Sequence, residues 1–298
     1  FANLKDLAVC SQRGLSERFD GSIGSATINF PMGGRYQATP ESGCTAKIPV
    51  LPPFETETSS LMTFGYDPRV AQWSPYHGSQ VAVLQSLARI ASLGGKPDSC
   101  RLTFQEYFEK PNKDGARWGK PLSALLGAFK AQLDYGIGSI GGKDSMSGTF
   151  ENINVPPMLM AFGITTVDAR TVISPEFKEA GNKIYVIRHT PEANYMPSTA
   201  CLKSNFDFVS EKIMEGDIVA AWAVGAGGVA EGVAKMAFGN KIGAALECDE
   251  QMLYNYAYGS IVVESRRTLN HPSAEYIGNT LKKEAIFING TRLPLEEL

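Results

Sequence analysis

The residues with the most evident chemistry lie together at positions 141–150. The segment opens with five residues suited to binding an anion: Gly141, Gly142, Lys143, Asp144 and Ser145. Glycine has no Cβ, so the two glycines let the backbone turn sharply and approach a ligand closely. Lys143 adds a positive charge, and successive backbone N–H groups in such a turn form an anion-binding concavity. The segment therefore predicts a turn that binds phosphate.

The same segment admits other interpretations. It is not the phosphate loop of the GxxxxGK[ST] pattern, which would require glycine in place of Ile137 and serine or threonine in place of Asp144. The alternative is a β-hairpin turn with a solvated lysine, because paired glycines are also common in turns. On the residues alone, phosphate binding and an ordinary turn both remain open.

A second glycine-rich segment, residues 224–230, fits the dinucleotide-binding pattern GxGxxA. Gly225, Gly227 and Ala230 occupy its fixed positions, and Ala226 and Gly228 lie between them. An expected strand precedes it, an expected helix follows, and acidic residues come about 20 residues later, as an NAD-binding fold requires. Small residues are equally needed where a helix packs tightly on a strand. We favour close packing and keep NAD binding as the alternative.

The other reactive side chains are scattered. The three histidines, His77, His189 and His271, are far apart and form no metal-ligand pattern. We expect His77 at the surface, in the first turn of a helix. Glu106 and Glu109 follow an apolar strand and could act as acid or base, yet we expect both at the surface. No serine or cysteine lies in a nucleophile motif, so we predict neither a catalytic residue nor a metal ligand in this chain.

Composition disfavours several classes of protein. The 298 residues are 43% hydrophobic and 20% charged with a net charge of −3, which suits a globular protein and disfavours a nucleic-acid partner. The longest apolar run, residues 218–230, is shorter than the ~20 residues that cross a bilayer, and we expect no membrane association or signal peptide. The five cysteines form no CxxC pattern, so we expect a reducing cytoplasm.

Hydrophobic periodicity divides the chain into three parts. Residues 1–44 are expected to form a helix, 1–19, and a connector, and because the chain opens with Phe1 rather than Met we expect a piece of a longer protein. Residues 45–169 are expected to form an α+β domain, with strands 45–50, 59–66, 100–108 and 155–167 and helices 75–93 and 121–135. Residues 170–298 are expected to form an α/β domain, with strands 183–189, 218–224, 242–248, 260–264 and 285–289 and helices 228–238, 250–258 and 274–282.

Several longer strings resemble the second half of the large phosphoribosylformylglycinamidine synthase, or formylglycinamide ribonucleotide amidotransferase. They are RLTFQEYF at 101–108, RWGKP at 117–121 and GGKDSMSGTF at 141–150, with shorter ones at 17–20, 74–78 and 155–157. The resemblance covers nearly the whole chain, and its Gly-Lys-Asp-Ser-Met string is the most specific. It implies the second, C-terminal aminoimidazole-ribonucleotide-synthetase-like module: fold class α+β, an α+β dimerisation domain followed by an α/β domain.

The resemblance implies a ligase of purine biosynthesis. In that family ATP, with Mg²⁺, phosphorylates the amide oxygen of formylglycinamide ribonucleotide, and ammonia from glutamine then displaces the phosphate to leave an amidine. By the same resemblance Gly142, Lys143 and Ser145 contact nucleotide or substrate phosphate, and Asp144 orients the loop or reaches a metal-bound water. The catalytic histidine and the glutaminase cysteine lie in other parts of the family's polypeptide. We therefore expect this chain alone to be inactive and to hold no Mg²⁺.

The chain departs from the family at a second nucleotide site. The family uses a helix glutamate, an asparagine four residues later and an Asp-Gly-Gly sequence there. The matching positions of this chain hold Gln85, Arg89 and Ala226-Gly227-Gly228. Carboxylates are the usual Mg²⁺ ligands, and arginine cannot be one. We expect a degenerate, metal-free auxiliary site in which Arg89 replaces the charge of the cation.

Three hypotheses describe the chain. The favoured one is a synthetase module whose partners are the N-terminal synthetase module and the glutaminase domain of the same polypeptide, with small-molecule substrates and neither nucleic acid nor membrane. The alternatives are an NAD-binding domain that uses residues 225–230 and a structural scaffold that holds those partners in register. An isolated module would expose the face meant for its counterpart, so we expect a homodimer.

Overall fold

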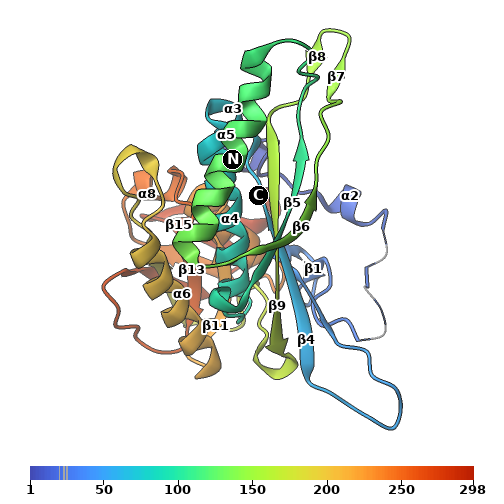
Figure 1. Cartoon of the computed structure of the whole chain (residues 1–298). Helices are drawn as coiled ribbons and strands as arrows, with labels where there is room; N and C mark the ends of the chain where they lie inside the picture. Colours follow the sequence, from blue (N-terminus) through green and yellow to red (C-terminus); the bar gives the residue numbers. More distant parts are fainter. Residues whose placement is uncertain (20, 23, 25) are drawn as a thin grey trace.

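Two large β-sheets organise the chain, and the helix α4 (Pro75–Ser92) lies between them. In the computed structural model, residues 1–19, 21–22, 24 and 26–298 are described. One sheet has five strands in the order β3-β4-β9-β5-β6, and the other has seven in the order β11-β13-β10-β14-β12-β15-β16. Figure 1 shows the first sheet with α5 on one side of it and the second sheet lower and behind. The expected α+β class is confirmed.

The five-stranded sheet is antiparallel except where β6 runs parallel to β5. A parallel neighbour needs a long crossover connection, and α5 supplies it between β5 and β6. The elements are β3 (Cys44–Lys47), β4 (Thr58–Gly65), α3 (Pro68–Trp73), α4 (Pro75–Ser92), β5 (Arg101–Tyr107), α5 (Gly115–Tyr135), β6 (Ser139–Lys143) and β9 (Met158–Asp168). Strands expected at 45–50, 59–66, 100–108 and 155–167 are thus present.

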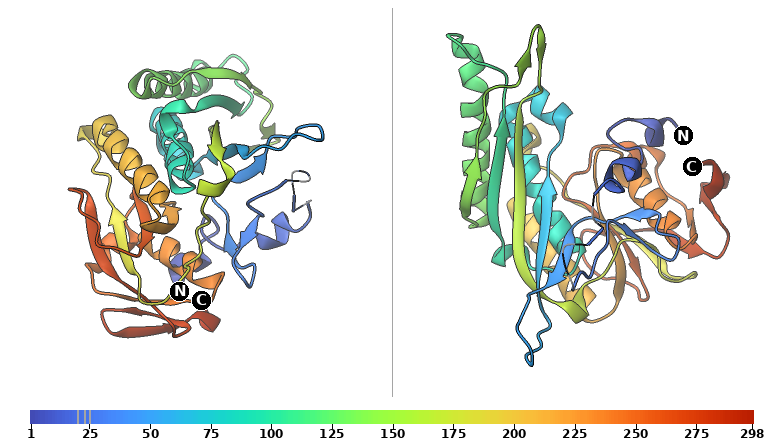
Figure 2. Two further views of the ribbon diagram at one scale, coloured as in Figure 1. Left: turned by 90° about the horizontal axis from the view of Figure 1, so that it is seen from below. Right: turned by 90° about the vertical axis from the view of Figure 1, so that its right-hand side faces the viewer.

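Helix α4 lies at the centre of the molecule. The hydroxyl of Ser74 accepts a hydrogen bond from the backbone of His77, and Pro75 follows at the first helical position, so the helix starts where the sequence predicts. Nearly every α4 side chain is buried, because β4 and β9 pack on one side and β11 and α6 on the other. Figure 2 shows α4 between the two halves of the chain. One hydrophobic core therefore runs through both halves.

The seven-stranded sheet is also mainly antiparallel, and only β12 and β15 pair in parallel. Its elements are β10 (Lys183–Ile187), α6 (Thr199–Met214), β11 (Ile218–Ala223), α7 (Gly228–Phe238), β12 (Gly243–Leu246), α8 (Glu250–Tyr254), β13 (Ile261–Ser265), β14 (Ala274–Leu281), β15 (Ala285–Ile288) and β16 (Thr291–Pro294). Helix α7 covers one face of this sheet and builds a second core with it.

The single helix expected over residues 1–19 is wrong. The segment forms two separate turns of helix, α1 (Ala2–Lys5) and α2 (Arg13–Ser16). Asp6 ends the first turn, because its backbone is extended and its carboxylate accepts the N–H of Ala8. The same carboxylate binds Arg69 of α3 at 2.7 Å from both oxygens. A contact with a residue far along the chain thus overrides the local periodicity.

The helix expected over residues 274–282 is also wrong, because this segment is β14. β14 pairs with β10 on one side and β12 on the other, and at Gly278 the backbone of β12 passes so close that no Cβ fits. In the second half of the chain, the edge strand β16 and helix α6 were also not expected. In α6 the buried residues follow helical spacing, so the signal was present in the sequence: Leu202, Phe206, Val209 and Ile213.

Candidate functional site

The glycine-lysine segment lies on the free edge of the five-stranded sheet. Residues 139–143 form β6, every residue of which is exposed. The turn expected at the two glycines is wrong, since both continue the strand and neither adopts a positive φ. Gly142 has a different requirement: a Cβ there would lie 2.7 Å from the carbonyl oxygen of Phe104 in β5. The glycines let β6 pair closely with β5 and leave the β6 edge open.

After Lys143 the chain crosses the end of β5. The backbone N–H of Phe108 donates to the carbonyl of Ser145 at 2.9 Å, and the N–H of Gly148 donates to the carbonyl of Phe108 at 2.9 Å. The hydroxyls of Ser145 and Ser147 lie 2.9 Å apart. This crossing places Lys143, Asp144 and the serine hydroxyls together beside the carboxyl end of β5.

The surface positions expected for Glu106 and Glu109 are wrong. Only 7% of Glu106 and 6% of Glu109 is exposed. Burial and the nearby negative charge of Asp144 raise the pKa of Glu106 to about 7. Its Oε1 atom has no hydrogen-bond partner among the described residues. Glu106 is therefore a carboxyl group that exchanges its proton near neutral pH, directly beside the glycine-lysine segment.

Glu109 is buried with compensating charge. Its carboxylate forms an ion pair with Lys120 of α5 and lies 3.7 Å from the guanidinium of Arg117. Buried carboxylates persist where such partners satisfy them. At this edge the sheet brings together one titratable carboxyl group, one paired carboxylate, the free charge of Lys143 and two hydroxyls. The arrangement suits binding of an anion and transfer of a proton.

The residues expected at the degenerate auxiliary site lie around the ends of β4. The Oε1 atom of Gln85 accepts the backbone N–H of Tyr66 at 2.9 Å. Arg89 donates from Nη1 to the carbonyl of Phe64 at 2.8 Å and lies over its ring, 4.3 Å from the centroid. Burial lowers the pKa of Arg89, and the charge of Glu231 opposes that shift. Arg89 is thus held by the backbone of β4 and Gln85 by that of Tyr66, the residue directly after β4, and Arg89 interacts electrostatically with α7.

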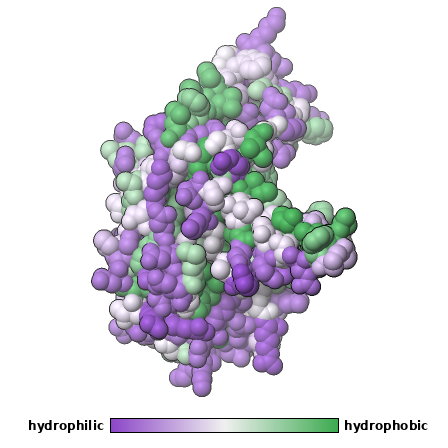
Figure 3. Space-filling view, turned by 60° about the horizontal axis from the view of Figure 1, so that its bottom comes forward, coloured by the Kyte–Doolittle hydropathy of each residue, from purple (hydrophilic) through white to green (hydrophobic). Residues whose placement is uncertain are grey.

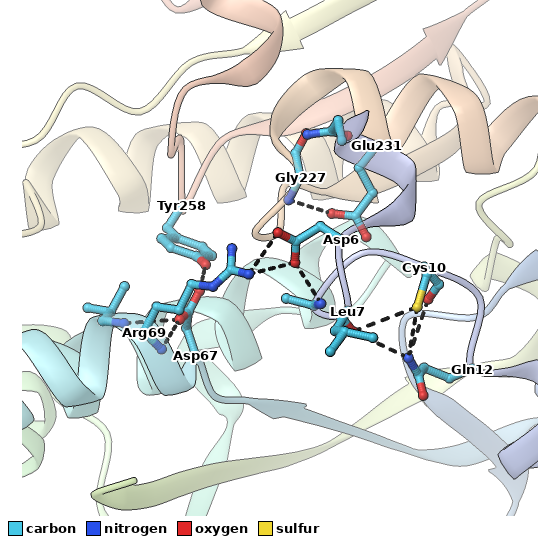
Figure 4. Close-up of polar contacts among 12 residues, drawn as sticks. Asp6, Leu7, Cys10, Gln12, Asp67, Arg69, Gly227, Glu231 and Tyr258 are labelled. Atoms are coloured by element: carbon cyan, nitrogen blue, oxygen red, sulfur yellow. Dashed lines mark hydrogen bonds and ion pairs between the residues drawn. The ribbon is translucent and has the colours of Figure 1, made fainter. Parts of the chain in front are cut away.

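The third part of the expected auxiliary site, the glycine-rich start of α7, is closed by its own helix. Glu231 turns back so that its Oε2 accepts the N–H of Gly227 at 2.9 Å, while its Oε1 accepts from Lys235 at 2.6 Å. Figure 4 shows this loop beside Asp6 and Arg69. The helix N-terminus, which would bind a pyrophosphate in a dinucleotide fold, already holds a carboxylate.

The sheet order also argues against the NAD-binding alternative. The dinucleotide motif requires a parallel strand-helix-strand unit. Here β11, which precedes the motif, lies at the sheet edge and pairs antiparallel with β13, whereas β12, which follows α7, lies elsewhere in the sheet. The favoured interpretation of residues 225–230 as a close-packed turn agrees with this arrangement.

A cavity of about 660 Å³ lies between the two halves of the chain. Its lining includes Trp73 and His77 from the first half and His189 and Tyr258 from the second. His189 is fully engaged, because Nδ1 lies 2.7 Å from the carbonyl of Tyr258 and Nε2 accepts the N–H of Ser198. The hydroxyl of Tyr258 donates in turn to Asp67, as Figure 4 shows. These contacts join the two halves of the chain, and both ring nitrogens of His189 are already hydrogen-bonded.

Comparison with curated proteins gives relatives of one kind. No family model matches the chain. The phosphoribosylformylglycinamidine synthase subunit PurL of Rhodopseudomonas palustris (strain BisB18) is 24% identical over 296 residues, which cover 93% of this chain and 38% of that protein. PurL of Nitrobacter winogradskyi is 25% identical over 270 residues, 84% of this chain and 34% of that protein. The resemblance seen in the sequence is confirmed. The chain spans little more than a third of the length of these PurL relatives.

Solved structures show the same fold. Thermotoga maritima PurL complexed with AMPPCP superposes with a TM-score of 0.68 at 16% identity, over 93% of this chain and 43% of that one. Thiamine monophosphate kinase of Aquifex aeolicus superposes with a TM-score of 0.57 at 11% identity, over 80% of this chain and 91% of that one. The chain therefore has the aminoimidazole-ribonucleotide-synthetase-like fold that PurL and this kinase share.

Two further observations concern metal ions and membranes. Across the described ranges, no group of three or more His, Cys, Asp or Glu side chains is placed to hold a metal ion. Among the same residues, no helix has both the length and the hydropathy to cross a membrane. The sequence indicated Glu106 as a possible acid or base but not its burial, although Glu106 lies at a position of β5 where the alternation of the strand predicts a buried side chain.

Proposed function

We propose that this chain is the C-terminal synthetase module of a phosphoribosylformylglycinamidine synthase. The whole enzyme would convert formylglycinamide ribonucleotide, ATP and glutamine to formylglycinamidine ribonucleotide. The observation that carries the proposal is the exposed edge strand β6, whose Gly141, Gly142 and Lys143 all face solvent. An exposed edge with unpaired N–H groups and a lysine supplies donors to phosphate oxygens. The homology to PurL along most of the chain supports the assignment.

Within this proposal the chain provides part of an active site. Gly142, Lys143 and Ser145 would bind phosphate, and Asp144 and Glu106 would stand beside it. Bound ATP supplies the phosphoryl group that activates the amide, and Mg²⁺ accompanies it. The remaining catalytic groups would come from the N-terminal synthetase module and the glutaminase domain. All five cysteines are unpaired, which is compatible with the proposed cytoplasmic location.

The role of Lys143 is tested in the full-length polypeptide that carries this module. We expect Lys143→Ala to reduce ATP-dependent amidine formation by at least tenfold, because one charge-assisted contact to phosphate is lost. Lys113→Ala, an exposed lysine before α5, is the matched control and should retain wild-type turnover. Steady-state kinetics with ATP and formylglycinamide ribonucleotide measure both. If Lys143→Ala kept the wild-type turnover, the proposed role of Lys143 would be wrong and the scaffold hypothesis would be favoured.

We also propose that the auxiliary nucleotide site is degenerate and free of metal. Gln85 and Arg89 are hydrogen-bonded to the backbone at the carboxyl end of β4 and directly after it, and Glu231 fills the N-terminus of α7 beside Gly227. Arg89 supplies a fixed positive charge close to this carboxylate. The site would then act as a structural joint between the two halves of the module, which is the part of the scaffold hypothesis that an observation favours.

The uncovered face of the five-stranded sheet is the proposed contact with the counterpart module. Along β4 and β9, alternate residues are buried against the helices, while the others remain partly or fully exposed. In the middle of the sheet this less buried set is apolar: Met62, Phe64, Met160, Phe162 and Ile164. Hydrophobic patches also interrupt the hydrophilic surface seen in Figure 3. A face of this kind favours association, so we propose that the isolated chain forms a homodimer that imitates the native pairing.

A further inference from the structure

Two acidic side chains converge on Gly33, far from β6. Gly33 lies in the small hairpin of β1 (Met32–Gly33) and β2 (Thr39–Pro40), which packs against residues 174–178. A Cβ built on Gly33 would lie 2.5 Å from Oε1 of Glu41 and 2.7 Å from Oε2 of Glu176. The two carboxylate oxygens can therefore be no farther apart than the sum of these distances, about 5 Å, and both border the space that the glycine leaves.

Two oxygens at this point have no partner among the described residues. They are Oε2 of Glu176 and Oδ1 of Asn29, and both residues are 7% exposed. The other ends of the two side chains are fixed. Oε1 of Glu176 accepts from Ser174 at 2.7 Å and from Lys178, and the amide nitrogen of Asn29 donates to Glu41 at 3.3 Å. A buried acceptor without a donor is unfavourable, so two of them beside one cavity favour the binding of a ligand there.

The local charge and space select the kind of ligand. Burial and the nearby charge of Glu176 raise the pKa of Glu41 to about 8, and Lys178 offsets the charge of Glu176. A cation that binds both carboxylates therefore takes the place of the Glu41 proton. The unpartnered atoms are acceptors only, so a neutral or anionic ligand without donors gains nothing there. A cavity of about 320 Å³, lined by Asn29, Gly33 and Glu41, adjoins them. It has room for water molecules that complete a coordination shell.

We propose that Glu41, Glu176 and Asn29 bind a hydrated divalent cation of the Mg²⁺ or Ca²⁺ type. Such cations take oxygen ligands, at 2.0–2.1 Å for Mg²⁺ and about 2.3–2.6 Å for Ca²⁺, so two oxygens bound to one ion lie at most about 4 Å apart for Mg²⁺ and about 5 Å apart for Ca²⁺. The two carboxylate oxygens, which lie no more than about 5 Å apart, match the Ca²⁺ limit. The carboxylates of Glu41 and Glu176 would supply two ligands, and the amide oxygen of Asn29 would supply a third. Water from the adjoining cavity would supply the rest.

The cation would tie the N-terminal hairpin to the C-terminal half. The hairpin already docks there through the backbone N–H of Arg35 on Asn240, at 2.8 Å, and that of Tyr36 on Gly239, at 2.8 Å. Glu176 packs against the same glycine, since a Cβ on Gly239 would meet its Cβ at 2.8 Å. The site is thus structural. It neither rests on the proposed ligase function nor uses any residue of the β6 edge.

Calorimetric titration of the EDTA-treated chain with MgCl₂ and separately with CaCl₂, without nucleotide, tests the proposal. We expect one site per chain and a higher thermal unfolding midpoint in the presence of the tighter-binding ion. Gly33→Ala fills the space without changing the charge, and Glu41→Gln removes one ligand charge; each should weaken binding at least tenfold. Gly138→Ala, where an added Cβ meets no atom, and Glu296→Gln at the exposed C-terminal end are the matched controls.

Two results would overturn the proposal. One is the absence of saturable binding by either ion. The other is binding that both Gly33→Ala and Glu41→Gln leave intact, which would place the ion elsewhere. Near-UV circular dichroism shows whether each variant remains folded, and if Gly33→Ala does not, Glu41→Gln decides. Because Lys143→Ala should bind the cation as well as the wild type does, failure here is separate from failure of the proposed enzyme function.

Discussion

At the scale of single residues, burial decides which side chains can titrate near neutrality, and Glu106 is the clearest case. Its folded pKa is about 7, against 4.5 for the exposed side chain, because burial and Asp144 both disfavour the charged form. The folded state therefore holds a proton that the unfolded state releases. The free energy of unfolding falls as the pH rises from about 4.5 to about 7, and the loss is complete above pH 7.

Replacing Glu106 by glutamine should remove this pH dependence. We expect Glu106→Gln to be more stable than the wild type above pH 7, by on the order of 2 kcal/mol, and to differ little from it at pH 4. Urea denaturation at several pH values measures the difference. Glu109→Gln is the matched comparison, and it should be destabilised instead, because its carboxylate pairs with Lys120. A constant offset between Glu106→Gln and wild type at all pH values would contradict the assigned pKa.

Residue positions such as these lie beyond what the sequence could predict. The glycine-lysine string indicated the right part of the chain, yet its glycines serve strand pairing rather than a turn. Glu106 becomes buried only because residues 144–148 fold across the end of β5. Glu41 and Glu176 meet across a long stretch of sequence, through a hairpin that periodicity did not reveal. Local patterns contain no information about contacts of this kind.

At the scale of elements, the helices with strong caps were predictable and the central strand β14 was not. Ser74-Pro75 marks the start of α4, and Gly136 in the left-handed conformation ends α5, as the sequence indicates. In β14, the central strand of its sheet, the apolar residues do not alternate cleanly, and Gly278 interrupts them. A short segment with mixed polarity is compatible with either helix or strand, and only its neighbours β10 and β12 decide.

The start of α7 leads to a prediction about the auxiliary site. Glu231 already accepts the N–H of Gly227, and we propose that Arg89 replaces a ligand of the family's metal site. ADP with MgCl₂ should therefore not change the unfolding midpoint in a Gly33→Ala background, which lacks the proposed cation site. Glu231→Ala should lower the free energy of unfolding by about 1–2 kcal/mol, because Gly227 and Lys235 lose their partner. Differential scanning fluorimetry and urea denaturation measure these effects. Saturable stabilisation by ADP and Mg²⁺ would show that the site is functional.

At the scale of the whole molecule, α4 makes one unit of two sheets. Its buried residues contact the five-stranded sheet on one side and β11 and α6 on the other, so a single core passes between the halves. The polar contacts at the N-terminal side of α4 reinforce this joint, with Asp67 bound to Tyr258 and Arg69 bound to Asp6. The two halves should therefore unfold together, and the outer face of the five-stranded sheet is the face that we propose for association.

The state of association tests whether that face is the contact between modules. We expect sedimentation equilibrium of the isolated chain to give a dimer, and Phe162→Asp to shift it towards monomer by at least tenfold in dissociation constant, because a charge would be buried in an apolar contact. Phe162 is half-buried in the middle of the sheet, opposite Phe64 of β4. Leu126→Asp, at an exposed leucine of α5 on the other side of the sheet, is the control. Should Leu126→Asp dissociate the dimer while Phe162→Asp does not, the association would run through α5 and the counterpart module could not be placed on the sheet.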